Sequence, residues 1–191
     1  MEAVAIVARV RLRCIRPADV DRFLVWAGDS EVRRHYLGAP CDSDGDPRSW
    51  VPQAGPASRA LRDWRPAGQV VRVIESADGL PLGWVELRDL NWRRRSGELR
   101  ICLGERACWG RGLGTAALRL FLAEAFDAWG LESVHLRVAT WNVRAVRAYR
   151  RCGFRRTGRL SAGDRAGAED LWLMTLSAER HASLAVEAAA P

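Results

Sequence analysis

Residues 108–115, which read CWGRGLGT, have a composition that suits anion binding. Three alternate glycines follow a predicted strand and precede a segment with helical periodicity. Alternate glycines let the backbone turn tightly and leave successive N–H groups pointing outward. Free amides at a helix N-terminus bind an anion through hydrogen bonds and the positive end of the helix dipole. The segment therefore predicts a loop that binds a pyrophosphate.

Two other phosphate-binding loops do not fit this segment. A Walker loop needs Gly-Lys followed by Ser or Thr, and the chain contains no lysine. The dinucleotide fingerprint needs GxGxxG near the first strand of a βαβ unit, whereas this GxGxG lies late in the chain after hairpin-like strands. A glycine turn that only lets helix and sheet pack closely remains the structural alternative.

Residues 142–154, which read NVRAVRAYRRCGF, form the second chemically suggestive segment. Asn142 suits a helix N-cap, and its side chain could instead hydrogen-bond a ligand or a neighbouring strand. Tyr149 is one of only two tyrosines in the chain. The segment predicts a helix that ends at Gly153 and carries a phenol on one face.

The two segments together resemble the acetyl-CoA signature of the GNAT superfamily of acetyltransferases. The family's glycine loop has Gln or Arg, two variable residues, Gly, one variable residue, and Gly or Ala. Trp109 stands at its first place here, and Gly112 and Gly114 match. The later pattern of Asn, two residues, Ala, three residues, Tyr, three residues and Gly-Phe matches without a gap. Trp-Gly-Arg-Gly is similar to the branch of ribosomal-protein and spermidine N-acetyltransferases, and the similarity extends over roughly Gln69–Met174 and, more loosely, Leu12–Tyr36.

This resemblance implies an α/β (α+β) fold with a mixed, mostly antiparallel sheet, a splayed parallel strand pair and flanking helices. It implies acetyl-CoA as cosubstrate and direct attack of an amine on the thioester. We expect a single acetyltransferase domain over residues 1–177 and a tail, frayed helix or disordered, over residues 178–191.

The resemblance also assigns the residues around the cofactor. The predicted contacts are Ile101, Cys102, Leu103, Trp109, Gly110, Arg111, Gly112, Leu113, Gly114, Thr115, Asn142 and Arg147. Tyr149 matches the tyrosine that protonates or hydrogen-bonds the departing thiolate, and packing alone is its alternative role. A phenol suits this donation because its pKa near 10 keeps it protonated at pH 7.

An amine must lose a proton before or during attack, so a base is expected near the thioester. Glu98 is the first candidate and Glu86 the second, although both could be ordinary carboxylates on a strand face. Backbone amides of the strand before the glycine loop would help to polarise the carbonyl oxygen. Cys102 and Cys108 have no paired histidine in the pattern, so a covalent thiol route is not expected.

The elements that must position these residues can be read from periodicity. The runs QVVRVIES and PLGWVELRDL flank the turn signal Ala77-Asp78-Gly79 and predict an antiparallel hairpin, and GELRICLG alternates as a third strand. The other predicted elements are a strand at Val10–Arg16, a helix at Ala18–Ala27, a helix from the glycine loop to Gly130, a strand at 133–140, a helix at 142–153 and a strand at Asp170–Leu176.

Composition excludes several classes of protein. The net charge of +7 comes from 30 arginines spread along 191 residues, so nucleic-acid binding is not expected as the main function. No apolar run reaches the roughly 18 to 20 residues that cross a bilayer, so we expect a cytoplasmic protein without a membrane partner. Five cysteines without a CxxC pair favour free thiols, and no metal site is expected. Nine tryptophans suggest an apolar surface patch and a homodimer.

The sequence does not encode the acceptor in a readable way. Residues Gly38–Pro66 are rich in Gly, Pro, Ser and Asp and predict a substrate loop, with Asp42, Asp44, Asp46 and Asp63 as residues suited to a polycation. Branch resemblance favours a protein N-terminal amine. A small-molecule amine, such as a polyamine or an aminoglycoside-type antibiotic, is the alternative, and a non-catalytic acyl-CoA-sensing module is a further one.

Overall fold

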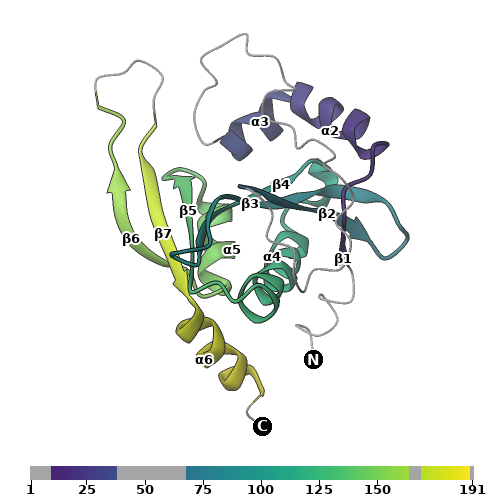
Figure 1. Ribbon diagram of the computed structural model, residues 1–191. Coiled ribbons are helices and arrows are strands. Elements are labelled where there is room, and N and C mark those ends of the chain that lie inside the picture. Colours follow the sequence, from purple (N-terminus) through teal and green to yellow (C-terminus); the bar gives the residue numbers. More distant parts are fainter. Residues whose placement is uncertain (1–9, 38–67, 164–168, 190–191) are drawn as a thin grey trace.

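The described part of the chain forms a seven-stranded mixed sheet with helices on both faces (Figure 1). The computed structural model describes residues 10–37, 68–163 and 169–189. The strands are β1 (Val10–Arg13), β2 (Val70–Ser76), β3 (Pro81–Asn91), β4 (Ser96–Leu103), β5 (Ser133–Ala139), β6 (Arg155–Leu160) and β7 (Leu171–Ser177). Their order is β1-β2-β3-β4-β5-β7-β6, and only the β4–β5 pair is parallel. The predicted fold class is confirmed.

The helices divide between the two faces of the sheet. They are α2 (Asp19–Gly28), α3 (Ser30–Leu37), α4 (Leu113–Ala123), α5 (Val143–Arg151) and α6 (Ala178–Ala189). In Figure 1, α2 and α3 cover one face, α4 and α5 cover the other, and α6 extends from the end of β7. None of the helices in the described ranges is both long and apolar enough to cross a membrane.

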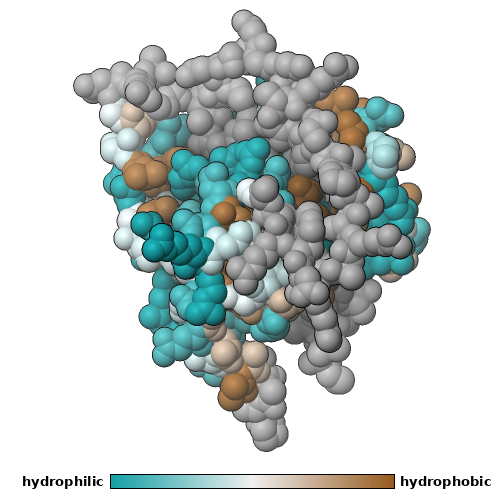
Figure 2. Space-filling model, viewed as in Figure 1, coloured by the Kyte–Doolittle hydropathy of each residue, from teal (hydrophilic) through white to brown (hydrophobic). Residues whose placement is uncertain are grey.

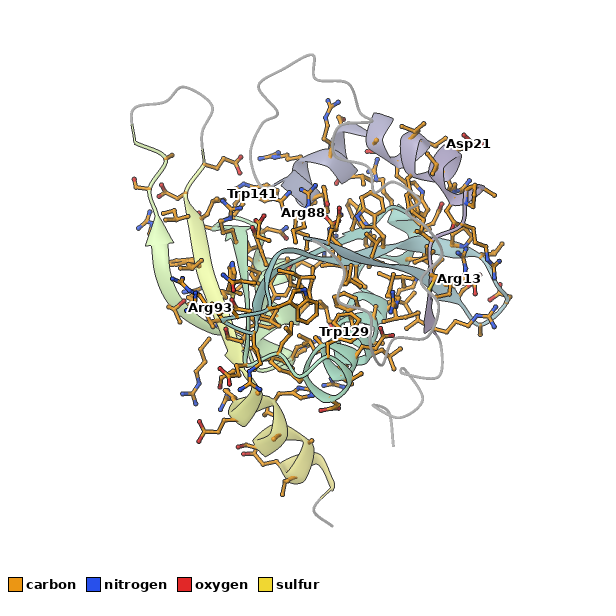
Figure 3. The ribbon with its side chains drawn as sticks, in the orientation of Figure 1. Arg13, Asp21, Arg88, Arg93, Trp129 and Trp141 are labelled. Carbon is orange, nitrogen blue, oxygen red and sulfur yellow. The ribbon has the colours of Figure 1, made fainter. Side chains whose placement is uncertain are left out.

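Each face of the sheet has its own apolar core, because successive side chains of a strand point to opposite faces. Val85 and Leu87 of β3 pack in the core beside α4, whereas Trp84 packs with Phe23 and Trp26 of α2 on the other face. Figure 3 shows Trp129 on the α4 side of the sheet and Arg88 on the side turned toward α3. The polar side chains of β3 and β4 therefore share the α2/α3 face.

The parallel strands β4 and β5 pair only at their beginnings. Their register runs from Ser96 opposite Ser133 to Glu98 opposite His135. Beyond these pairs β4 continues to Leu103 and β5 to Ala139. The strands thus splay apart toward their carboxyl ends, as predicted, and the gap opens beside the glycine loop.

Some boundaries differ from the sequence-based expectations. The first strand ends at Arg13 rather than Arg16. The helix after the glycine loop changes from α to π winding after Ala123, and the π turn ends at Ala128, two residues before Gly130, whose φ is +65°. The edge strand β6 was not predicted, because all six of its residues are exposed and RRTGRL has no apolar alternation. The expectations for Gly38–Pro66, with its four aspartates, lie outside the described residues.

The tryptophans of the described residues do not form the exposed patch that suggested a homodimer. Among the described residues the large exposed apolar side chains are Val25, Leu80, Val143, Leu160 and Val186. The described part of the face in Figure 2 is largely hydrophilic, with its apolar residues in small separate patches. The homodimer stays a prediction, and the described tryptophans give it no support.

Candidate active site

The glycine loop ends in an uncapped helix N-terminus. Gly110 and Gly112 have φ values of +76° and +80°, which is the left-handed region that glycine enters without strain. Gly112 is the N-cap residue of α4, where no side chain caps the helix, and the first bond of the helix runs from the Ala116 N–H to the Gly112 oxygen at 3.0 Å. The N–H groups of residues 113–115 therefore have no partner within α4. This is the geometry that the predicted anion-binding turn requires, and the binding of an anion there stays a prediction.

Trp109 fixes this loop to its surroundings. Its indole N–H donates to the Leu103 carbonyl oxygen at the end of β4, at 2.8 Å. The Arg144 guanidinium of α5 lies 4.1 Å from the centre of the Trp109 ring system, and the ring of His35 of α3 lies 4.9 Å away. One side chain thus connects the loop with β4, α3 and α5, which positions the amides of α4 relative to the splayed strands.

A cavity of about 360 Å³ opens between β4, the glycine loop, α4, α5 and α3. Of the predicted cofactor contacts, those that line it are Ile101, Cys102, Leu103, Trp109, Gly110, Gly112, Gly114, Thr115, Asn142 and Arg147. The side chains of Arg111 and Leu113 do not. Arg111 is exposed, and Leu113 packs against the core beside α4.

Three arginines of α5 line the same cavity. Arg144, Arg147 and Arg151 form no ion pair with any residue in the described ranges. Only Arg147 was predicted. Their spacings of three and four residues place them on neighbouring positions of one helix face, and this signal could have identified all three. Unpaired positive charge beside free helix amides suits a ligand with several phosphates.

Tyr149 lies between the main cavity and a smaller one of about 100 Å³ that continues between the splayed strands. Its side chain is buried and packs edge-on against Phe154, with ring centres 5.8 Å apart. Among the described residues its hydroxyl has no hydrogen-bond partner. Burial raises the pKa of Tyr149 above its ordinary value of 10. The phenol therefore keeps its proton at neutral pH.

Asn142 serves as a helix cap, one of the roles that the sequence left open. Its Oδ1 accepts a hydrogen bond from the Ala145 N–H at 3.2 Å, which caps α5. Its Nδ2 donates to the His35 carbonyl oxygen at 3.5 Å, which links α5 to the end of α3. The residue therefore shapes the cavity wall through α5 and α3.

The two candidate bases are both held by other side chains. Arg137 of β5 donates two hydrogen bonds to the carboxylate of Glu98, at 2.9 and 2.7 Å. Burial alone would raise the pKa of Glu98, but these bonds and the positive charges nearby lower it below its ordinary value. Glu86 is fully buried and accepts hydrogen bonds from the Tyr36 hydroxyl and the Gln69 side-chain amide. Only Glu98 lines a cavity, and its low pKa makes it a weak base.

His35 is a further group on the cavity walls that the sequence reasoning missed. It lines both the main and the smaller cavity. Its Nδ1 lies 2.9 Å from the Glu31 carbonyl oxygen, which can only accept, so Nδ1 is the donor of this hydrogen bond and Nε2 is the acceptor nitrogen of the neutral ring. His35 belongs to the N-terminal segment Leu12–Tyr36, which is loosely similar to the family, and this position in the sequence could have marked it as a candidate.

Comparison with known proteins identifies the family. A family model described as "Acetyltransferase (GNAT) domain" matches residues 9–155. The chain belongs to the GNAT acetyltransferase family. The glycine loop lies between β4 and α4, and the helix α5 with Asn142 and Tyr149 follows β5, which is the order that the resemblance implies.

Curated relatives of this GNAT chain include two small-molecule acetyltransferases. It is 33% identical to spermidine N(1)-acetyltransferase of Vibrio cholerae over 88 residues, which are 46% of this chain and 50% of the relative. It is 32% identical to mycothiol acetyltransferase of Mycobacteroides abscessus over 169 residues, which are 79% of this chain and 54% of the relative. The chain thus spans about half the length of the curated relatives it matches.

Solved structures show the same fold. The spermidine N-acetyltransferase of Vibrio cholerae, in complex with CoA and spermine, superposes with a TM-score of 0.73 at 21% identity. The match covers 92% of this chain and 99% of that one. At this identity the likeness concerns the fold alone.

Proposed function

We propose that the chain is an acetyl-CoA-dependent N-acetyltransferase that acts on a small-molecule amine. The observation that carries the proposal is the main cavity, which joins free amides of α4 and three unpaired arginines to a buried, protonated Tyr149. This donor set fits CoA, because amides and guanidinium groups bind phosphates and the apolar walls of Ile101, Leu103 and Ala148 suit the pantetheine arm.

The proposed reaction places each residue in one role. Bound acetyl-CoA supplies an acetyl group activated as a thioester. The amine attacks the carbonyl carbon from the smaller cavity, so that a C–N bond forms and the C–S bond breaks. Tyr149 donates its hydroxyl proton to the departing sulfur. His35 Nε2 takes the proton of the amine, directly or through water, and is better suited than Glu98, whose carboxylate is held by Arg137.

Glu86 has a positioning role in this proposal. It holds the hydroxyl of Tyr36, and Tyr36 lines both cavities. Burial and the neighbouring Glu86 carboxylate raise the pKa of Tyr36 well above its ordinary value, so this phenol also stays neutral.

A small acceptor replaces the protein N-terminus that branch resemblance favoured. The relatives are named for spermidine and mycothiol. The smaller cavity, of about 100 Å³, also suits a small amine. These observations support the alternative that the sequence left open.

Calorimetric titration with acetyl-CoA, followed by thiol release on a panel of small amines, tests the proposal. We expect micromolar binding, weakened about tenfold in Arg147→Gln because a charge-assisted contact to phosphate is lost. Arg119→Gln is the matched control, since Arg119 is an exposed arginine of α4 that does not line the cavity. Absence of binding would overturn the proposal for the cavity, and binding without thiol release on any amine would favour an acyl-CoA-sensing module.

A further inference from the structure

Charged side chains of alternating sign cover the α2/α3 face of β3 and β4 beyond Tyr149. In the antiparallel register Arg88 lies opposite Glu98, and Glu86 lies opposite Arg100. Arg137 of β5 adds a third guanidinium beside Glu98. We call Arg88, Arg100 and Arg137 the acceptor-side arginines.

These arginines line a path outward from the proposed reaction centre. Arg100 and Arg137 line the smaller cavity together with Tyr149. The same two residues, with Glu98, also line a further open cavity of about 360 Å³, whose wall includes Arg88 and Asp89. A molecule whose amine lies near Tyr149 therefore extends past Arg100 toward Arg88, on the side of the sheet where Figure 3 labels Arg88.

The carboxylates on this path accept hydrogen bonds from other side chains, whereas the guanidinium groups of Arg100 and Arg88 form only long ion pairs. Glu98 accepts two hydrogen bonds from Arg137, and Glu86 accepts those of Tyr36 and Gln69. Within the described ranges the side chains of Arg100 and Arg88 make no hydrogen bond. Their nearest carboxylate contacts are at 3.8 Å, from the Arg100 Nε to Glu98 and from the Arg88 Nε to Glu86.

Both of these guanidinium groups are partly buried. The exposed fraction of the side chain is 26% for Arg100 and 34% for Arg88. A partly desolvated guanidinium has planar N–H donors that match a carboxylate or phosphate in a two-point contact. The outer cavity has three arginines against the two acids Asp89 and Glu98, which is the opposite of what a polycation needs.

We propose that Arg100, with Arg88 beside it, binds an anionic group of the acceptor. The inference rests on the proposed function and narrows its substrate class. The preferred acceptor is an amine that carries a carboxylate or a phosphate in the same small molecule, and not a polyamine.

Matched pairs of amines test the substrate class. Thiol release is measured for β-alanine against β-alaninamide, for phosphoethanolamine against ethanolamine, and for spermidine. We expect kcat/KM to be at least about tenfold higher for the anionic member of at least one pair. A preference within the first pair indicates a carboxylate site, and a preference within the second pair indicates a phosphate site. Equal rates within both pairs, or a preference for spermidine, would overturn the inference. Thiol release from none of these or other small amines would instead contradict the proposed function.

Variants test whether Arg100 is the specificity residue. In Arg100→Gln the ratio of kcat/KM between the anionic and neutral members should fall toward one, and Arg100→Lys should restore part of it because the positive charge remains. Arg93→Gln is the matched control: Arg93, labelled in Figure 3, is an exposed arginine in the turn between β3 and β4 and lines none of these cavities. A ratio that stays unchanged in Arg100→Gln, or that falls equally in Arg93→Gln, would contradict the assignment.

Discussion

Tyr149 combines three properties that a proton donor in this chemistry needs. Its side chain lies between the two cavities, its hydroxyl has no partner in the described part of the chain, and burial raises its pKa above 10. A donor with a raised pKa stays protonated over the whole range in which an amine becomes a free base. In the proposed reaction the phenol therefore needs to break no hydrogen bond within the described residues before it donates to the departing sulfur.

Replacing Tyr149 by Phe should lower kcat by about 100-fold, the lower end of what a positioned general acid contributes. The KM for acetyl-CoA should change little, because the ring and its packing against Phe154 remain. Steady-state thiol release at saturating acceptor measures both constants. In the wild-type protein kcat should not decline as the pH rises toward 10, since the raised pKa keeps the donor protonated. An unaltered kcat in Tyr149→Phe would remove the residue from the mechanism.

Single residues were predictable where local spacing decides their place. Gly112, Trp109 and Tyr149 lie where the motifs placed them, because a glycine turn and a short helix fix the positions of their neighbours in the chain. The surroundings of Glu98 were not predictable. Its partner Arg137 comes from another strand, 39 residues away in the sequence, and only the sheet register brings the two together.

At the scale of elements, the turn before α4 is the part that binds the phosphates in the proposed function. Gly110 and Gly112 hold the loop in a left-handed conformation that leaves the first amides of α4 free. The proposed phosphate site therefore requires positive φ values at both glycines, as does the turn itself.

Replacing Gly110 by Ala should raise the KM for acetyl-CoA by about tenfold, because a Cβ at positive φ costs about 1–2 kcal/mol and the loop relieves this by moving its amides. Gly130→Ala is the matched control. Both glycines have positive φ, and at both an added Cβ meets no atom within 4 Å, but Gly130 does not line the cavity. Both variants should lose similar stability in thermal unfolding, and only Gly110→Ala should lose affinity. Equal affinities would mean that the loop conformation does not position the amides.

Elements with strong periodicity were predictable, and those set by tertiary contact were not. The β2–β3 hairpin follows from two apolar runs around Gly79, and its antiparallel pairing is confirmed. Strand β6 has six exposed residues and no apolar pattern, and it forms through its antiparallel hydrogen bonds with β7. For residues 178–191 the sequence left a frayed helix and a disordered tail open, and residues 178–189 form the helix α6.

At the scale of the whole molecule, a network of ion pairs connects β1, β2 and α2. Arg13 of β1 donates to Asp19 at the start of α2, at 2.7 Å through each of two nitrogens, and to Glu75 of β2 at 2.8 Å. The Arg16 backbone N–H also donates to Asp19, at 2.6 Å. This network attaches α2 to the edge of the sheet, and α2 in turn covers one of the two cores.

Replacing Asp19 by Asn should therefore lower the free energy of unfolding at about pH 7 by about 1.5–3 kcal/mol, the range for hydrogen bonds to charged groups. Burial alone would raise the pKa of Asp19, but its bonds to Arg13 and Arg16 lower it below its ordinary value. A carboxyl with a lowered folded pKa stabilises the protein above its unfolded pKa, near 3.9, and this stability is lost as the pH falls through the folded pKa.

The difference between wild type and Asp19→Asn should accordingly be greatest near neutral pH and shrink as the pH falls below about 4, which urea unfolding at several pH values measures. Asp21→Asn is the matched control, because Asp21 lies in the same first turn of α2 but is exposed and has no ion pair in the described residues (Figure 3). It should change stability by less than about 0.5 kcal/mol at any pH. If the difference in unfolding free energy between wild type and Asp19→Asn does not depend on pH, the variant has lost packing or helix capping. The charge of Asp19 would then not contribute to stability.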